Sequence, residues 1–173
     1  MIHLLAISGS LRAVSTNTTL LKAAMRLAPP GVRIALYDGL SGLPPFNPDL
    51  DVEPLPPAVA AWRAAIDAAD GLLISSPEYA RGVPGTLKNA FDWLVSSAAF
   101  PGKPVAFFHA SERAVASQAA WRLILETMSA RLVDEATITI ALLGQQADAA
   151  DVAEDLQKAE KIRDALAAFA AAI

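Results

Sequence analysis

Short apolar runs alternate with segments of helical periodicity along most of the chain. The apolar runs predict five β-strands, at residues 2–8, 32–37, 71–75, 104–109 and 136–142. Between them, apolar positions recur every three or four residues; Val59, Trp62 and Ile66, for example, form one stripe. This periodicity predicts five helices, at residues 17–27, 58–69, 84–95, 118–130 and 151–172. Strands and helices therefore follow one another in regular alternation.

Residues 41–57 interrupt this alternation, because six prolines fall within them. Proline has no backbone N–H and is poorly tolerated inside helices and central strands. We therefore expect a long surface loop between the second strand and the second helix. Pro84, by contrast, stands in the first turn of a predicted helix, where a missing N–H costs little.

Strands that are separated by helices pair in parallel through right-handed crossovers. The pattern therefore predicts an α/β fold, a three-layer doubly wound domain with a five-stranded parallel sheet. With strand order 2-1-3-4-5, the winding reverses between strands 1 and 3, and ligands of such sheets bind at that point beyond the strand ends. We find no repeat and no linker, so residues 1–173 are expected to form one domain.

Composition supports this fold and excludes several classes of function. Hydrophobic residues make up 54% of the chain and charged residues 18%, as parallel sheets buried on both faces require. The net charge of −4 disfavours binding to nucleic acid or to an anionic membrane surface. The chain has no cysteine and two histidines, so no metal site is expected. Without a signal peptide or a spanning helix, a cytoplasmic location is expected.

The loop after the first strand carries the clearest chemical signal. Hydroxyl, amide and guanidinium groups cluster there, directly before a predicted helix; they belong to Ser10, Arg12, Ser15, Asn17 and Thr18. The free N–H groups and the dipole of a helix N-terminus favour an anion. An arginine can bind two phosphate oxygens at once. The loop therefore predicts a site for a terminal phosphate.

The loop after the third strand should supply the other half of the site. Residues 76–85 carry an aromatic side chain, Tyr79, and are punctuated by Pro77, Gly82, Pro84 and Gly85. Such a constrained backbone can present N–H and C=O groups at fixed positions to the edge of a flat ring. A phosphate on one side and a planar edge on the other fit a phosphorylated flavin or a nucleotide.

These two loops resemble the NADPH-dependent FMN reductase family, whose fold is flavodoxin-like. The resemblance rests on Gly9-Ser10-Leu11-Arg12 with Ser15 and Asn17, and on the segments 77–79, 83–85, 87–90 and 92–93. It implies FMN as cofactor, with its phosphate held by Ser10, Arg12, Ser15, Asn17 and Thr18. It also implies that the flavin ring is framed by Pro77, Glu78, Tyr79, Ala80, Arg81, Gly82 and Val83. Family members usually have Asn at the position of Ala80.

A second departure from the family lies after the fourth strand. The family commonly carries a loop with paired glycines there, whereas residues 110–116 contain no glycine. That loop usually lies near the substrate side of the flavin. Ser111 is expected to contact the cofactor, and Arg113 either reaches the pocket or faces solvent.

The resemblance implies an NAD(P)H-dependent oxidoreductase that reduces a quinone, an azo compound, a metal oxyanion or a flavin. No side chain is predicted to be catalytic, because hydride passes between nicotinamide and flavin without a protein acid or base. Two alternatives stay open: a flavin-binding electron carrier, and a binder of another phosphate ligand. Glu78 can instead cap a turn, and His109 is expected to be structural. The apolar region around Phe91 and Trp93 predicts a homodimer or homotetramer, because this region helps to form dimers in the family that the chain resembles.

Overall fold

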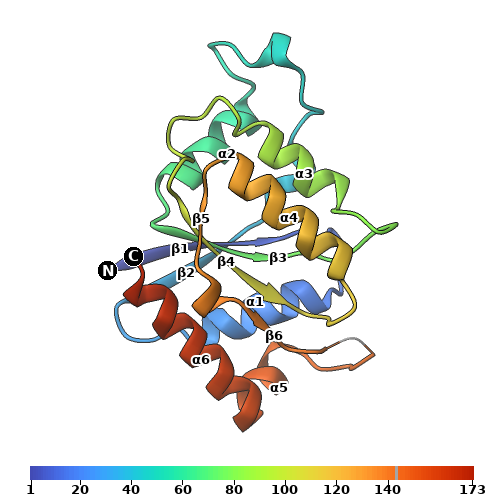
Figure 1. Ribbon diagram of the computed structural model, residues 1–173, viewed down its shortest axis with the longest axis vertical. Helices are drawn as coiled ribbons and strands as arrows, with labels where there is room; N and C mark the ends of the chain where they lie inside the picture. The colour runs from blue at the N-terminus through green and yellow to red at the C-terminus, as the bar shows by residue number, and fades with distance from the viewer. Residues whose placement is uncertain (143) are drawn as a thin grey trace.

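A parallel sheet with helices on both faces forms the protein (Figure 1). The computed structural model describes every residue except residue 143. The strands of the sheet follow the order β2-β1-β3-β4-β5, and β6 also pairs with β4. Their bounds are β1 Ile2–Ser8, β2 Val32–Tyr37, β3 Gly71–Ser75, β4 Pro104–His109, β5 Arg131–Leu132 and β6 Ile138–Thr139. All of these pairings are parallel, so the predicted fold class and strand order are confirmed.

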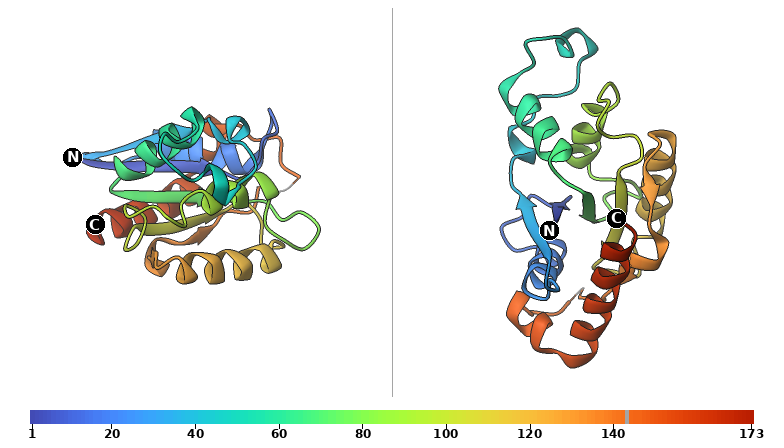
Figure 2. Two further views of the ribbon diagram at one scale, coloured as in Figure 1. Left: turned by 90° about the horizontal axis from the view of Figure 1, so that it is seen from above. Right: turned by 90° about the vertical axis from the view of Figure 1, so that its left-hand side faces the viewer.

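The helices form two layers, one on each face of the sheet. Helices α1 (Thr16–Arg26), α5 (Ala149–Glu154) and α6 (Leu156–Ala171) cover one face (Figure 1). Helices α2 (Pro57–Asp67), α3 (Gly85–Asp92) and α4 (Val115–Thr127) cover the other. The right-hand view of Figure 2 shows the same two layers on either side of the sheet. Both chain termini lie at the end of the sheet opposite the loops that follow the strands (Figure 1).

Two hydrophobic cores result, and the central strands divide their side chains between them. In β1, Leu4 and Ala6 join the core under α1 and α6, whereas Leu5 and Ile7 join the core under α2, α3 and α4. Successive side chains of a strand point to opposite faces, so a strand buried on both faces is apolar at every position. This explains why the strands appear in the sequence as unbroken apolar runs. In the described part of the chain, no helix is long and apolar enough to cross a membrane.

The end of the sheet differs from the sequence prediction of one strand at 136–142. Two short strands, β5 and β6, lie beside β4, separated by a 3-10 turn at Asp134–Ala136. The predicted segment does run along β4, because the N–H of Ile140 bonds to His109 O at 2.9 Å and that of Leu142 to Ala110 O at 3.0 Å. The sequence therefore placed this segment correctly beside β4. It predicted too long a strand there and did not predict β5.

The C-terminal helix predicted at 151–172 is in fact two helices. Asp148 caps α5 through a reciprocal pair of bonds with Asp151. Asp155 leaves the helical conformation, and its carboxylate accepts the N–H of Lys158 at 3.1 Å, which starts α6. An aspartate that bonds a backbone N–H three residues later is a preferred helix start. The apolar periodicity continues across Asp155, which is why the break was not predicted.

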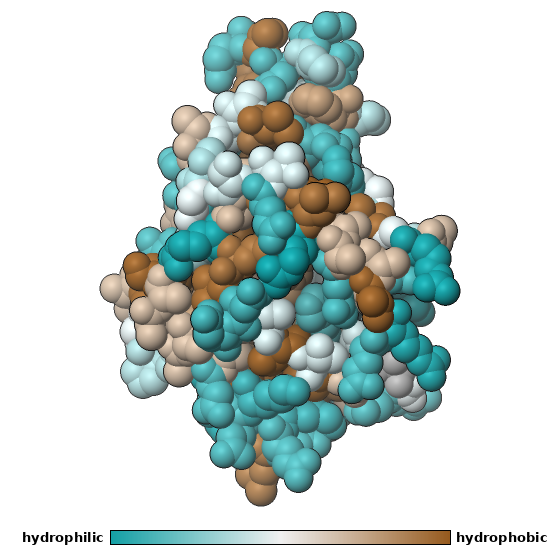
Figure 3. All heavy atoms as spheres, viewed as in Figure 1, coloured by the Kyte–Doolittle hydropathy of each residue, from teal (hydrophilic) through white to brown (hydrophobic). Residues whose placement is uncertain are grey.

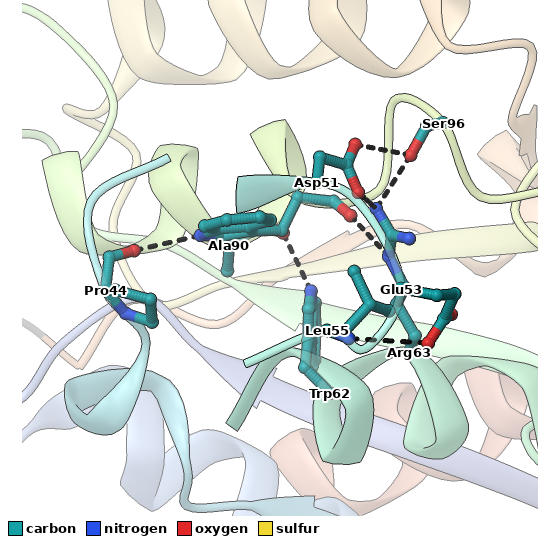
Figure 4. Close-up of polar contacts among 9 residues, drawn as sticks. Pro44, Asp51, Glu53, Leu55, Trp62, Arg63, Ala90 and Ser96 are labelled. Atoms are coloured by element: carbon teal, nitrogen blue, oxygen red, sulfur yellow. Dashed lines mark hydrogen bonds and ion pairs between the residues drawn. The ribbon is translucent and has the colours of Figure 1, made fainter. Parts of the chain in front are cut away.

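The proline-rich segment is a surface loop, as predicted, and it is tied to α2 and α3 (Figure 4). The guanidinium of Arg63 donates to Asp51 Oδ1 at 2.7 Å and to Ser96 Oγ at 2.8 Å. The indole N–H of Trp93 donates to Pro44 O at 2.9 Å. Phe91 and Trp93 are 0% exposed, so they pack inside the chain. They offer no surface for assembly, and that part of the sequence argument for a dimer was wrong.

Candidate functional site

The loops that follow β1, β3 and β4 meet at one edge of the sheet and enclose a cavity of about 520 Å³. Eight of the residues predicted from the sequence line it: Ser10, Arg12, Ser15, Asn17, Pro77, Glu78, Tyr79 and Ser111. Val14, Thr16, Ser76, Ala110, Arg113, Ala114, Gly144 and Gln145 complete the lining. Two segments about 70 residues apart in the sequence are therefore brought together, as the switch-point argument requires.

The first loop leads into the N-terminus of α1. Ser15 is the cap residue, and its Oγ accepts the N–H of Thr18 at 3.4 Å. Thr16 and Asn17 belong to the first turn, whose N–H groups have no acceptor within the helix. Asn17 Oδ1 accepts a bond from Ser75 Oγ at 3.0 Å, which directs the amide NH₂ of Asn17 to act as the donor on its other side. Helix dipole, backbone donors and amide together form a site for an anion.

Close packing of the two loops fixes the position of this anion site. A Cβ built on Gly9 would lie 3.0 Å from Leu87 Cδ2 and 3.2 Å from Pro77 Cδ, so a side chain would push the loops apart. Ser10 is buried, and its Oγ accepts the N–H of Arg12 at 3.4 Å. The exposed side chain of Arg12 then extends along the wall of the cavity.

Thr18 does not line this cavity. Its hydroxyl pairs with Ser8 Oγ at 2.8 Å and lines a neighbouring cavity of about 270 Å³, together with Tyr37 and Asp38. The two cavities share Ser10 and Arg12. In this structure, Thr18 supports the loop through Ser8 instead of facing the larger cavity.

Ala80 and Arg81 form the tip of a tight turn in the second loop. Tyr79 and Gly82 exchange both backbone hydrogen bonds, at 3.0 and 2.9 Å, and the two residues between them have φ of +50° and +64°. Two successive residues with positive φ define the turn that Asn and Gly favour and that alanine disfavours. Ala80 therefore stands at a backbone position that asparagine adopts more readily than alanine. The predicted residues Ala80, Arg81, Gly82 and Val83 lie outside the cavity lining.

Glu78 binds to helix α4 and thereby joins the second loop to the third. Its Oε2 accepts the N–H of Ser117 at 3.0 Å, in the first turn of α4. Ser117 Oγ donates in return to Pro77 O at 3.2 Å, and the indole N–H of Trp121 donates to Ser76 Oγ at 2.8 Å. A carboxylate at a helix N-terminus is stabilised by free N–H groups and by the dipole. Glu78 therefore caps a helix, although not a turn in its own loop, and α4 begins three residues before the predicted residue 118.

The third loop is a tight turn without glycine. The N–H of Arg113 donates to Ser111 Oγ at 3.1 Å, and Gln118 Nε2 bonds Ser111 O at 3.5 Å. Both Ser111 and Arg113 line the cavity, and Arg113 is also exposed to solvent. No sequence signal pointed to Gln145, which reaches the lining from beyond β6.

Charge in the cavity is predominantly positive. Arg12 and Arg113 line it, and the carboxylate of Glu78 is engaged by α4. None of the ion pairs within the described part of the chain involves either arginine. Nor do the described residues contain a group of three His, Cys, Asp or Glu side chains that could hold a metal. The donor set fits a phosphate at the α1 end and an uncharged ring beside the second and third loops.

His109 lies outside this lining, at the end of β4. The side chain is 9% exposed and stacks on Phe107, with ring centroids 5.4 Å apart and planes at 9°. Burial lowers the pKa of His109 from 6.5 to about 4. The imidazole is therefore neutral at physiological pH and is not available there as a proton donor.

Comparison with known proteins identifies the family. The family model described as NADPH-dependent FMN reductase matches residues 2–145. The chain belongs to this family. It is 46% identical over 112 residues to an NAD(P)H-dependent FMN reductase of Pseudomonas aeruginosa. The matched segment covers 64% of this chain and 60% of that protein. It is also 46% identical over 97 residues to an NADPH:quinone oxidoreductase of Arabidopsis thaliana, covering 54% and 49% respectively. The chain thus matches about half of the length of these curated relatives.

Solved structures share the fold of this chain over almost its whole length. The flavoenzyme NAD(P)H:acceptor oxidoreductase FerB of Paracoccus denitrificans superposes with a TM-score of 0.85 at 27% identity, over 98% of this chain and 95% of that one. A flavodoxin of Pseudomonas aeruginosa, at 14% identity and a TM-score of 0.58, shares the fold. The resemblance inferred from the two loops is therefore confirmed. Family membership supports FMN as the cofactor and NAD(P)H as the electron donor.

Proposed function

We propose that this protein is an NAD(P)H-dependent, FMN-containing oxidoreductase that reduces small acceptors. The observation that carries the proposal is the single cavity that joins a helix N-terminal anion site to two loops suited to a flat ring. In this proposal the cofactor carries the chemistry, and the residues of the lining bind and position it. The named relatives, which include FMN and quinone reductases, support the same class of reaction.

In this proposal, each part of the lining has a separate task. Ser10, Arg12 and Ser15, with Asn17 and the first N–H groups of α1, bind the phosphate. The segment 77–79 and Ser111 hold the ring, and the bonds of Glu78 and Ser76 to α4 keep that segment in position. Thr18 and residues 80–83 support the loops from outside the cavity. FMN held there would supply the hydride and electron transfer between NAD(P)H and the acceptor, and the residues of the lining would position it.

A flavin-binding electron carrier that does not use NAD(P)H is the competing function. It is favoured by the lack of the glycine-rich loop after β4, because that loop usually lies on the substrate side of the ring. In this chain the loop is closed by Ser111 and continues into α4, whose N-terminus is bound by Glu78. A binder of a different phosphate ligand is the remaining alternative.

Anaerobic mixing with NADPH and NADH separates these functions. We expect the purified protein to be yellow and its flavin absorbance near 450 nm to bleach within seconds in excess NADPH or NADH, a rate within the usual range of enzyme turnover. A suitable quinone should then restore the colour. A protein that binds FMN but bleaches only with dithionite would be a carrier. A protein that neither contains nor quenches FMN would refute the flavin assignment.

We also propose that the protein assembles as a homodimer or homotetramer. Large apolar side chains near the cavity are exposed, including Val14 at 83%, Val115 at 65% and Tyr79 at 49%. On the face shown in Figure 3, apolar areas are scattered among hydrophilic ones. We expect light scattering at tens of micromolar to give at least twice the chain mass of 18.1 kDa, because stable dimers dissociate at far lower concentrations. A monomer mass would refute the assembly. The cytoplasmic location stays a prediction.

A further inference from the structure

The loop after β4 places an arginine on the cavity wall that the family's glycine-rich loop would otherwise form. Arg113 lines both the main cavity and an adjoining cavity of about 370 Å³, which Ser111, Glu112, Ala141 and Gly144 also line. The bond from the N–H of Arg113 to Ser111 Oγ holds the base of the side chain in a tight turn. Arg113 is an exposed residue and is common to the linings of the two cavities.

Arg113 and the phosphate site belong to loops whose strands, β4 and β1, are separated in the sheet by β3. The strand order places the loop after β3 between the loops after β1 and β4. Arg12 belongs to the first of these loops and Arg113 to the last, so they approach the cavity from opposite sides of the segment 77–79. The phosphate site is complete without Arg113, because α1, Arg12 and Asn17 already supply its donors.

The charge balance leaves Arg113 without an anionic partner. Glu78 is the carboxylate of the main lining, and it is bound to the N-terminus of α4. Glu112 lines the adjoining cavity but forms no ion pair with Arg113. Oxidised FMN carries its negative charge on the phosphate, and its ring is neutral. FMN therefore offers no negative charge to Arg113, which lies beside the loops expected to hold the ring. The positive charge of Arg113 remains for the ligand that binds next to FMN.

We propose that Arg113 is a specificity-determining residue that binds an anionic substituent of the electron acceptor, such as a sulfonate, a carboxylate or an ionised hydroxyl group on a quinone. The inference rests on the proposed function. A small acceptor must lie against the ring, where Arg113 can reach its substituent. The 2′-phosphate of NADPH, by contrast, lies on the adenosine half of the molecule, far from the nicotinamide that must contact the ring. It is therefore a less suitable partner for Arg113. The overall reaction converts NAD(P)H, one proton and the quinone into NAD(P)⁺ and the hydroquinone, and Arg113 takes part in no bond made or broken.

Two quinones that differ in charge test this proposal. With 1,4-naphthoquinone-2-sulfonate, Arg113→Gln should lower kcat/KM about 3- to 5-fold, the upper part of the range for an ion pair at an exposed site. With neutral 1,4-naphthoquinone, the same variant should change kcat/KM less than twofold. Arg113→Lys, which keeps the charge, should retain part of the preference. Arg163→Gln removes an equal charge from an exposed position on α6 and should leave both values unchanged.

Binding of redox-inert analogues provides a readout that does not depend on turnover. Naphthalene-2-sulfonate should perturb the flavin spectrum of the oxidised holoprotein at lower concentration than 2-naphthol, and Arg113→Gln should abolish the difference. Equal losses for both compounds, or no loss for either, would overturn the proposal. The proposal would also be overturned if Arg113→Gln slowed bleaching of the flavin by NADPH but not by NADH. That result would assign Arg113 to binding of the electron donor. A holoprotein that NAD(P)H fails to bleach would refute the proposed function, while the binding comparison would still test Arg113.

Discussion

Replacing Arg12 by alanine should weaken FMN binding by about 1.5–3 kcal/mol, or roughly 10- to 150-fold in Kd, as expected for lost charge-assisted bonds to a phosphate. Arg12 extends along the cavity from the loop that leads into α1, and its N–H is held by Ser10 Oγ. The backbone donors of α1 and the amide of Asn17 remain in the variant, so binding should be reduced and not lost. Fluorescence titration of the apoprotein with FMN measures the change.

Riboflavin, which has the same ring and no phosphate, is the matched ligand for this experiment. Its affinity should be unchanged in Arg12→Ala, and Arg163→Ala should alter neither ligand's affinity. Increasing salt should weaken FMN binding to the unmodified protein more than to Arg12→Ala, because ions screen an exposed pair. Equal FMN affinities in the variant and the unmodified protein would remove the phosphate assignment on which the proposed function depends.

The fold could be predicted because its signals are local and repeated. Each central strand is buried on both faces and therefore appears as an apolar run, and each covering helix has an apolar stripe. The handedness of the connections restricts the possible strand orders, and the order 2-1-3-4-5 taken for the sheet is the one observed. The same reasoning places the loops after β1 and β3 at one edge, which is why eight predicted residues share a single cavity.

The parts that were missed depend on contacts between distant segments. The start of α4 at Val115 depends on Glu78, 39 residues before the N–H that it accepts. The pairing of the Thr18 hydroxyl with Ser8 Oγ likewise joins two segments that the sequence pattern does not connect. Phe91 and Trp93 have the composition of an interface, but the chain itself buries them. Sequence pattern identifies candidate groups, whereas tertiary packing decides which of them face the ligand.

The loop after β4 illustrates how a departure from the family pattern is accommodated. Without glycines, the segment closes as a turn on Ser111, and α4 is joined to the second loop by three side-chain bonds. Ser111 and Arg113 therefore line the cavity at the place where the family pattern has a glycine-rich loop. Substrate choice is the property that such a change should alter, more than cofactor binding.

His109 should make stability depend on pH in a range where most carboxylates remain ionised. Burial beside Phe107 lowers its folded-state pKa to about 4, against 6.5 for an exposed histidine. Well above pH 6.5 the imidazole is neutral in both states, so it contributes no dependence on pH there. Between pH 6.5 and 4 the unfolded chain takes up a proton that the folded chain does not. The free energy of unfolding therefore falls as the pH falls, by about 1.4 kcal/mol per unit.

Between pH 7 and pH 5 this histidine alone should lower the free energy of unfolding by about 2 kcal/mol. Urea unfolding of the apoprotein, followed by tryptophan fluorescence at both pH values, measures the change. His109→Gln stays neutral throughout and should lose about that much of the pH dependence, whereas His3→Gln, at an exposed position of β1, should retain it. Since carboxylate titrations are common to all three proteins, the difference between them isolates His109. Equal pH dependence in His109→Gln and the unmodified protein would show that the imidazole is protonated in the folded state, which its burial against Phe107 should prevent.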